Sequence, residues 1–292
     1  MPLTQLNYTV FDAFTASRFR GNPAAVIVLQ PDHGLSDALL QLIGREFNLS
    51  ETAFLVPLED HHDDAPHFSI RWFTPALEAP LCGHATLAAA CHLRLNHPEL
   101  QPPYRFASRL SGELKVNYLA EQDLYELDFP ADIPVALADP DVPAGIEMAH
   151  TWFPKLARGE IKAVLKTGRG YLVEAAETVD VSAVAYDPVT IARDIPIGQC
   201  VLTGPHKPTA EDPSRVHSRM FACGSGLNED PVTGSAHTRI VPYWLGKWGG
   251  DALKCRQVSA RVGELDTVWL RDEGRVLLRG HGVKTAEGVL FL

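Results

Sequence analysis

The sequence predicts a protein of two similar domains, each built from both strands and helices. Three observations support this prediction. The chain has 292 residues, and at roughly 150 residues per domain that length suggests two domains with a core each. Segments with strand and helix periodicity alternate along the chain. A pattern of residues in the first half also recurs in the second half.

Local signals place the elements of the first half. Segments 8–14 and 24–29 are predicted to be strands, separated by the turn signal Gly21-Asn22-Pro23. Ser36 is the expected N-cap of a helix that ends near Asn48. Further strands are expected at 49–56, 68–73, 114–118 and 124–129.

The segment 85–93 differs from the other predicted helix because almost all of its residues are small or apolar. No face of such a helix is suited to water, so we expect it to be buried nearly all round. In the second half, strands are expected at 171–174 and 219–223. A helix after Gly234 and further strands complete the chain.

The segment 130–143 is the best candidate for a linker, because Pro134 and Pro140 are interspersed there with Ala and Asp. It divides the chain into an N-terminal domain, 1–129, and a C-terminal domain, 130–292. The alternative that the last strand of the chain pairs within the first domain stays open.

One pattern occurs in both halves. Arg71-Trp72-Phe73-Thr74 leads to Gly83-His84-Ala85-Thr86, and Arg219-Met220-Phe221-Ala222 leads to Gly234-Ser235-Ala236-His237. Each half therefore has a strand, a loop rich in Gly, Pro and acids, and a Gly-x-Ala start to a helix. We interpret this as a duplicated unit whose two helix N-termini line a cleft. Because helix N-termini bind anions, the expected partner is a small acidic metabolite.

Composition excludes several classes of partner. The chain has 26 Lys and Arg against 36 Asp and Glu, a formal net charge of −10. It has no basic stripe, so we expect no nucleic-acid partner. Its apolar stretches are far shorter than the roughly 20 residues that cross a bilayer, and its first residues show no secretory signal. We therefore expect a cytoplasmic protein with no membrane partner.

The cysteines and histidines give no metal motif. Five cysteines are scattered without a Cys-x-x-Cys pair, so a zinc knuckle is not supported, and most should be buried as small hydrophobes. The polar stretch His61-His62-Asp63-Asp64, with His67 nearby, is interpreted as a solvated loop rather than a metal site. No metal is expected.

Several residues near the repeated pattern are candidates for chemistry, each with a structural alternative. Glu51 is a carboxylate beside an apolar strand, either a general base or a solvated strand end. Asp230 is either a functional acid or a turn residue. His84 is either a neutral imidazole that polarises a substrate or an ordinary, partly buried histidine. Ser235 either faces the cleft or caps its helix, and Cys82 is a candidate because helix N-termini activate thiols.

The usual cofactor signatures are missing. The sequence has no Walker A loop, no G-x-S-x-G elbow, no H-E-x-x-H and no G-x-G-x-x-G after a strand. Gly168-Arg169-Gly170 and Gly224-Ser225-Gly226 are too short to be nucleotide fingerprints. We therefore expect a reaction that needs no cofactor.

The candidate residues belong to longer segments that can be compared with known families. These segments are Phe11–Phe14 with Gly21–Val26, Asn48–Thr52, Arg71–Pro75 with Gly83–Leu87, and Asn228–Ala236. As a set, and in this order, they resemble the PhzF-like (phenazine-biosynthesis) isomerase family over most of the chain. The resemblance implies an α+β protein with the diaminopimelate-epimerase-like fold. In that fold each of two similar domains is a sheet or barrel wrapped around a central helix, and the active site lies in the interdomain cleft.

The resemblance also implies an activity and residue roles. The protein is expected to be a cofactor-independent isomerase and a homodimer that moves a proton by acid/base catalysis. Glu51 matches the family's catalytic acid/base in its Ser-Glu motif. The expected substrate-binding residues are Ser50, Gly83, His84, Asp230, Gly234 and Ser235.

Two other hypotheses stay open. A thiol racemase would use Cys82, but the segment 231–234 carries no second cysteine, and Cys223 is the nearest one. A binding or regulatory protein would keep the cleft without turnover. In addition, 237–239 (His-Thr-Arg) adds bulk and charge after Ser235, which would alter the substrate if any of these side chains faces the cleft.

Overall fold

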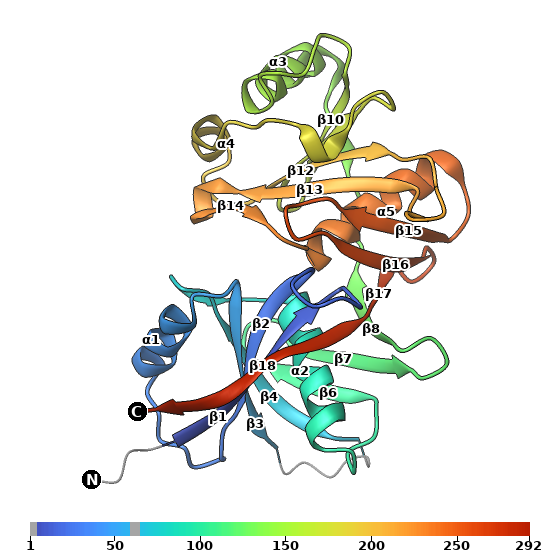
Figure 1. Ribbon diagram of the computed structural model, residues 1–292. Helices are drawn as coiled ribbons and strands as arrows, with labels where there is room; N and C mark the ends of the chain where they lie inside the picture. Colours follow the sequence, from blue (N-terminus) through green and yellow to red (C-terminus); the bar gives the residue numbers. More distant parts are fainter. Residues whose placement is uncertain (1–4, 59–64) are drawn as a thin grey trace. The chain divides into compact units, whose positions relative to one another are not determined.

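The structure, a computed structural model, describes residues 5–58 and 65–292, and the chain divides into two compact units (Figure 1). Unit 1 combines the residues up to Asp128 with Arg279–Leu292, and unit 2 is Phe129–Leu278. The chain leaves unit 1 within β8 (Leu124–Pro130) and returns within β17 (Arg275–Gly280). The last strand, β18 (Gly282–Phe291), therefore belongs to unit 1.

The strands of unit 1 pair in the order β18-β1-β2-β3-β4-β6-β7-β8. The pairs β2–β3 and β4–β6 are parallel, and the other pairs in this order are antiparallel. The two-residue strand β5 pairs with the end of β4. Besides β8 and β18, these strands are β1 (Gln5–Ala13), β2 (Asn22–Val28), β3 (Glu51–Pro57), β4 (His67–Phe73), β5 (Glu78–Ala79), β6 (Tyr104–Ser108) and β7 (Gly112–Leu119).

Helix α2 (Gly83–Asn96) lies at the centre of unit 1, and Figure 1 shows strands of that unit around it. It contacts β1, β2, β3, β7 and β18, and every residue from His84 to Leu93 is buried. Alanines fill most of its middle, so strands can approach it from several sides. The prediction of a helix buried nearly all round is confirmed.

Helix α1 (Asp37–Phe47) confirms the two cap residues predicted from the sequence. The hydroxyl of Ser36 accepts a hydrogen bond of 3.3 Å from a main-chain N–H in the first turn. Asn48 has a φ of 50° and ends the helix in the left-handed conformation, which Asn adopts more readily than most residues. The two ends of α1 are therefore set by the side chain of Ser36 and the backbone conformation of Asn48.

Unit 2 repeats the pairing scheme of unit 1. Its strands pair in the order β9-β10-β11-β12-β13-β15-β16, with β11–β12 and β13–β15 parallel and the rest antiparallel. Helix α5 (Gly234–Trp248) follows β13 and β14, as α2 follows β4 and β5, and it contacts β12, β15 and β16. The predicted duplication is therefore present in the strand order, the pairing senses and the helix position. The strands are β9 (Val135–Ala136), β10 (Ile161–Thr167), β11 (Gly170–Ala175), β12 (Gln199–Pro205), β13 (Val216–Ala222), β14 (Leu227–Asp230), β15 (Ala252–Gln257) and β16 (Gly263–Leu270).

The interpretation of 130–143 as a linker was wrong. This segment contains β9, which pairs with β10, and a short 3-10 helix, η1 (Asp139–Asp141). It then opens helix α3 (Val142–Trp152), whose first turn holds a proline, where the missing N–H removes no helix bond. The buried Trp152 anchors this helix to the core of unit 2.

The remaining short helices of unit 2 were not predicted. Helix α4 (Pro188–Asp194) begins with a proline, and the side chain of Asp187 caps it by accepting from the N–H of Val189 at 2.9 Å. Two 3-10 helices complete the unit, η2 (Val181–Ala183) and η3 (Cys223–Ser225). Such elements are too short to show a hydrophobic period.

Three further expectations concerned the cysteines, the histidine-rich stretch and membrane-spanning helices. All five cysteines are free and buried, as expected for small hydrophobic side chains. The stretch His61-His62-Asp63-Asp64 lies outside the described residues, and His67 begins β4. Within residues 5–58 and 65–292, no helix has both the length and the apolar character that crossing a membrane requires.

Candidate functional site

Two parallel strands and a helix start bring the predicted residues of unit 1 together. Glu51 is the first residue of β3 and pairs with Ala24 in β2. Asn22 is the first residue of β2. Because β2 and β3 are parallel, both strands begin at the same edge of the sheet. The side chains of Glu51 and Asn22 both reach His84, in the first turn of α2.

His84 is the centre of this group. Its Nε2 lies 3.0 Å from Oε2 of Glu51, and its Nδ1 lies 3.1 Å from Nδ2 of Asn22. The sulfur of Cys82 lies 3.4 Å from the same Nδ1. An amide that donates to Nδ1 leaves the ring proton on Nε2, the ring nitrogen near the carboxylate, although this N–H is not aligned for a hydrogen bond with Oε2. The imidazole is therefore oriented between an amide and an acid.

Burial makes this group unusual for charged and polar side chains. His84 and Cys82 are only 4% and 5% exposed, while the side chain of Glu51 keeps 17% of its surface. Among the described residues, Oε2 of Glu51 is buried and makes no hydrogen bond of good geometry. Buried carboxylate oxygens normally have such a partner. Glu51 therefore combines a route to solvent with an oxygen that can accept a proton.

Ser50 and Gly83, also predicted from the sequence, lie next to this group. Ser50 is partly buried and immediately precedes β3. Gly83 is the first residue of α2, so main-chain N–H groups of the first helical turn are found beside His84. Of the two, Gly83 brings main-chain N–H groups to the start of the helix, and Ser50 lies next to Glu51 in the chain.

The predicted residues of unit 2 form a second group at the start of α5. Asp230 is the last residue of β14 and is buried. Its carboxylate accepts a short hydrogen bond from the hydroxyl of Thr233, the residue before α5. The amide of Gln257 donates to the carbonyl of Asp230 at 2.7 Å and accepts from the N–H of Thr233 at 2.8 Å. One buried amide therefore holds the loop that leads to Gly234.

Ser235 does not cap its helix. It is the second residue of α5, and its Oγ accepts a hydrogen bond of 3.2 Å from Nε2 of Gln199. Gln199 begins β12 and pairs with Gly170 in the parallel strand β11. Gln199 therefore has the same place in unit 2 that Glu51 has in unit 1.

The charged residues after Ser235 point into the interior of unit 2. His237 is fully buried, its Nδ1 lies 2.8 Å from the carbonyl of Thr233, and burial lowers its pKa to about 4. Arg239 is also fully buried, 3.5 Å from Asp132, and burial lowers its pKa to about 10. Neither residue adds an exposed charge to the start of α5.

Sequence reasoning missed Asn22, Gln199 and Gln257. All three are amides whose roles depend on which strand lies beside which. The repeat itself held a signal for one of them, because extending it back by one strand aligns the start of β12 with the start of β3. Gln199 would then have been compared with Glu51.

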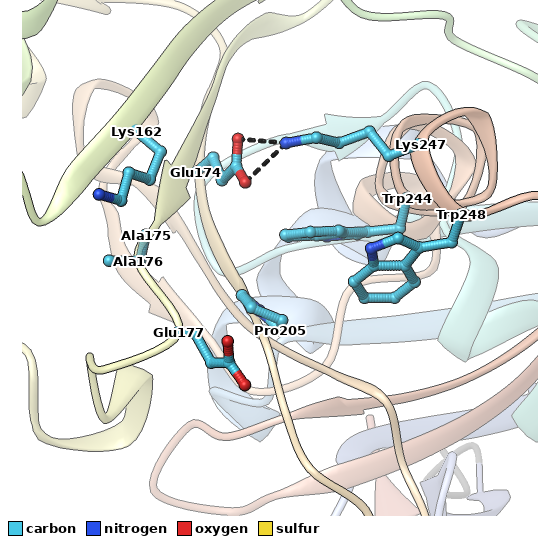
Figure 2. Close-up of a pocket in the computed structure, with 9 residues that line it drawn as sticks. All are labelled: Lys162, Glu174, Ala175, Ala176, Glu177, Pro205, Trp244, Lys247 and Trp248. Carbon is cyan, nitrogen blue, oxygen red and sulfur yellow. Dashed lines mark hydrogen bonds and ion pairs between the residues drawn. The ribbon is translucent and has the colours of Figure 1, made fainter.

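A groove elsewhere in unit 2 contains none of the predicted site residues (Figure 2). Trp244 and Trp248 form one side of it. Figure 2 shows Lys247 directed at Glu174, and its Nζ lies 2.7 and 2.8 Å from the two carboxylate oxygens. The ammonium and the carboxylate therefore neutralise each other, and we assign no chemistry to this groove.

Comparisons with known proteins agree on one family. Residues 11–288 match the family model described as phenazine biosynthesis-like protein (PhzC-PhzF). The chain is 40% identical over 289 residues to an uncharacterized isomerase of Pseudomonas aeruginosa, covering 99% of each chain. A crystal structure of a PhzF family protein from Enterococcus faecalis superposes with a TM-score of 0.82 and 32% identity, covering 99% of this chain and 100% of that chain.

A more distant structure shows how widely the fold occurs. A hydroxyproline epimerase from Agrobacterium vitis superposes with a TM-score of 0.57 and 13% identity, covering 99% of this chain and 93% of that chain. At this identity the likeness concerns the fold alone. Together the two structures confirm the predicted α+β class and its epimerase-like fold.

Proposed function

The chain belongs to the phenazine biosynthesis-like family, a family of isomerase-like enzymes, and we propose that it moves a proton within a small carboxylate-bearing substrate without a cofactor. The observation that carries the proposal is the contact between Glu51 and His84. A buried carboxylate oxygen without a hydrogen bond of good geometry lies 3.0 Å from an imidazole nitrogen. The carboxylate is held on this side by the imidazole and keeps 17% of its side-chain surface exposed, so it is suited to accept a proton from a substrate carbon.

The proposed reaction has two proton transfers. The carboxylate of Glu51 takes a proton from a carbon made acidic by conjugation, and the electron pair of the broken C–H bond enters the conjugated system. Glu51 then returns a proton to another carbon on the same face, so the product has the formula of the substrate. No electron is gained or lost overall. Positioned acid/base groups of this kind typically contribute 10²–10⁴-fold to a rate.

The main-chain N–H groups at the starts of α2 and α5 support binding of an acidic substrate. The first N–H groups of a helix have no partner within it, and the helix dipole is positive at that end. In the proposal, those at Gly83 and Gly234 hold carboxylate and stabilise the charge that develops in the transition state. Asp230 and Ser235 bind the substrate, as the family resemblance implies. The hydrogen bonds from Thr233 and Gln199 orient these two side chains.

Solvent-deuterium incorporation tests the proposal. The protein is incubated in deuterium oxide with a panel of small amino and cyclic unsaturated acids, and products are followed by NMR and mass spectrometry. The Glu51→Gln variant should keep its fold and bind the acid found in this way, but lose deuterium incorporation by at least roughly a hundredfold. Glu46→Gln, an exposed glutamate on α1, is the matched control. Retained exchange in Glu51→Gln would remove Glu51 from the mechanism.

The thiol racemase is the second candidate, because Cys82 contacts His84. A two-thiol mechanism needs a second thiolate, and unit 2 has Thr233 at the position of Cys82. The thiol of Cys223 donates to the carbonyl of Asn228 at 3.3 Å, and burial raises its pKa. These features favour the carboxylate. Cys82→Ala should therefore retain deuterium incorporation, whereas a racemase that depends on this thiol would lose it.

The third hypothesis, a binding protein without turnover, predicts a different result with the same panel. Ligands would raise the melting temperature of the protein, yet no acid would exchange a proton or change its structure. The isomerase predicts that at least one stabilising acid also incorporates deuterium. The loss of incorporation in Glu51→Gln then separates catalysis by the site from slow exchange in solution.

A further inference from the structure

The group at the start of α2 has the composition of a metal site as well as that of an acid/base site. Glu51, Cys82 and His84 each offer one donor atom, and these three atoms lie within 4.8 Å of one another. Nε2 of His84 is 3.0 Å from Oε2 of Glu51 and 3.9 Å from the sulfur of Cys82. A thiolate, an imidazole and a carboxylate are the three common side-chain ligands of zinc in proteins.

These separations are close to those of a tetrahedral site. Zinc–ligand bonds of about 2.0–2.3 Å place neighbouring ligand atoms roughly 3.3–3.6 Å apart. The two separations around Nε2, 3.0 and 3.9 Å, differ from that range by a few tenths of an ångström, although the sulfur lies nearer to Nδ1, at 3.4 Å. A cation on Nε2 therefore requires the imidazole and the Cys82 side chain to turn, so that the sulfur moves from the Nδ1 side of the ring to the Nε2 side. A water would take the fourth position, as in other sites with three protein ligands.

The surroundings hold the imidazole as the second shell of a metal site does. The amide of Asn22 lies 3.1 Å from Nδ1, on the ring edge away from the proposed cation. Such an amide can present its oxygen to an Nδ1–H once Nε2 binds a metal. The carbonyl of Cys82 accepts a 2.6 Å hydrogen bond from the hydroxyl of Thr86, which fixes the main chain at this ligand.

Two other places in the described part of the chain are less suited to a cation. At the matching positions of unit 2, Gln199, Thr233 and Ser235 offer only amide and hydroxyl groups. The cluster of His206, Asp212 and His217 has suitable donors. However, Nη1 of Arg256 lies 2.9 Å from Oδ2 of Asp212, so a fixed positive charge already occupies that carboxylate. We therefore place the cation at the start of α2.

We propose that Glu51, Cys82 and His84 bind a thiophilic divalent cation of the Zn²⁺ class, and that the bound cation switches off proton transfer. On binding, the thiol of Cys82 releases its proton to solvent and forms a metal–sulfur bond, and the ring proton of His84 moves from Nε2 to Nδ1, which leaves the lone pair of Nε2 for the cation. No oxidation state changes. The switch rests on the proposed function, because a carboxylate oxygen bound to the cation no longer accepts a proton from a substrate. The 17% exposure of the Glu51 side chain provides the route of entry.

Metal binding is measured first, without any substrate. Chelator-treated protein is titrated with Cd²⁺, whose bond to a thiolate gives an ultraviolet charge-transfer band, and with Zn²⁺ against a chromophoric chelator. We expect one ion per chain at low-micromolar free metal. Cys82→Ser should abolish the band and weaken Zn²⁺ binding by roughly tenfold or more, since even outer-shell changes at metal sites have effects of that size. Glu51→Gln should weaken binding while keeping the band.

Matched controls identify the site. Cys223→Ser removes a buried thiol at the loop before α5, and His217→Asn removes a donor of the other cluster, so both should bind Cd²⁺ and Zn²⁺ as the wild type does. If wild-type protein binds no metal in this range, or if Cys82→Ser binds as tightly as the wild type, the proposed site is wrong. If Cys82→Ser fails to fold, the affinity of Glu51→Gln for Zn²⁺ decides instead: weaker binding than the wild type supports the site, and equal binding shows that it is wrong.

The switch is measured separately, as deuterium incorporation by the wild type with and without Zn²⁺. Saturating Zn²⁺ should reduce the rate at least tenfold, and a chelator should restore it. Metal that binds at this site without inhibiting would overturn the switch but leave the site. A metal-free wild type that exchanges no proton with any acid of the panel would instead count against the proposed function, whatever the metal titration shows.

Discussion

The starts of α2 and α5 share one scaffold and differ in chemistry. Three positions correspond, namely the first residue of the second parallel strand, the residue before the helix, and the second residue of the helix. The pairs are Glu51 with Gln199, Cys82 with Thr233, and His84 with Ser235. All three side chains of unit 1 are of types that serve as acids, bases or nucleophiles, whereas those of unit 2 are an amide and two hydroxyls. The duplication therefore supplies two sets of three equivalent positions, and only the set in unit 1 carries acid/base groups; the carboxylate of Asp230 lies outside these positions.

Charges that both units share have a different role. Arg71 forms two hydrogen bonds of 2.9 Å with the carboxylate of Glu78, and Arg219 forms bonds of 2.7 and 2.8 Å with that of Glu229. Each pair joins a long strand, β4 or β13, to the short strand that follows it, β5 or β14, and both strands precede the helix. A charged pair that recurs in both units belongs to the scaffold. A charged group found in one unit only, such as Glu51, is a candidate for chemistry.

The largest expected effect on stability comes from breaking the shared pair in unit 2. Arg219 is buried, and apart from Glu229 its guanidinium donates to the carbonyl of Val184. Glu229→Gln removes its carboxylate partner and should lower the free energy of unfolding by about 3–5 kcal/mol. Glu78→Gln should have a smaller effect, because Arg71 keeps a 2.7 Å contact with Asp37. Chemical denaturation of both variants measures the difference, and equal losses would contradict this comparison.

A second prediction concerns one buried histidine in each central helix. Burial lowers the pKa of His92 in α2 and of His237 in α5 to about 4, against 6.5 for an unperturbed side chain. Between these values the unfolded chain binds protons that the folded chain does not, so stability falls as the pH falls from about 6.5 towards 4. Each histidine contributes up to roughly 3 kcal/mol to this loss, and neither contributes above pH 6.5.

Denaturation curves at a series of pH values test this prediction. His92→Gln and His237→Gln should each reduce the dependence of stability on pH below 6.5, whatever their effect at pH 7. A slope that both variants leave unchanged would show that other groups cause the acid sensitivity.

The smallest expected effect is at the counterpart of the catalytic position. Gln199→Leu removes the hydrogen bond to Ser235, which is worth about 1 kcal/mol. In the proposed function this raises KM roughly fivefold and leaves kcat nearly unchanged, because the residue orients a binding group and moves no proton. Steady-state kinetics with the acid found in the panel measures both constants. A large fall in kcat would place Gln199 in the chemistry.

Some features could be predicted from sequence because their causes are local. Ser36 and Asn48 mark the ends of α1 through their own side chains and backbone preferences, and almost all residues of 85–93 are small or apolar. Glu51 and His84 were identified as candidates because each stands beside a recognisable strand or helix start. Their contact, however, depends on strands that are adjacent only in the folded chain.

Other features had causes that the sequence pattern hides. The prolines of 130–143 suggested a linker, but the structure places one of them in the first turn of α3, where proline is tolerated. Gln199 and Gln257 were missed because an amide has no characteristic spacing, and its role follows from the register of β12 and β15. Arg239 suggested a charge at the site, but it is buried beside Asp132.

The central claim is that the acid/base chemistry belongs to the start of α2 alone. Solvent-deuterium incorporation by Glu51→Gln and Gln199→Leu, measured side by side on the same acid, tests it most directly. The account predicts that the first variant loses incorporation and the second retains it at saturating substrate. Incorporation that persists in Glu51→Gln and disappears in Gln199→Leu would contradict it.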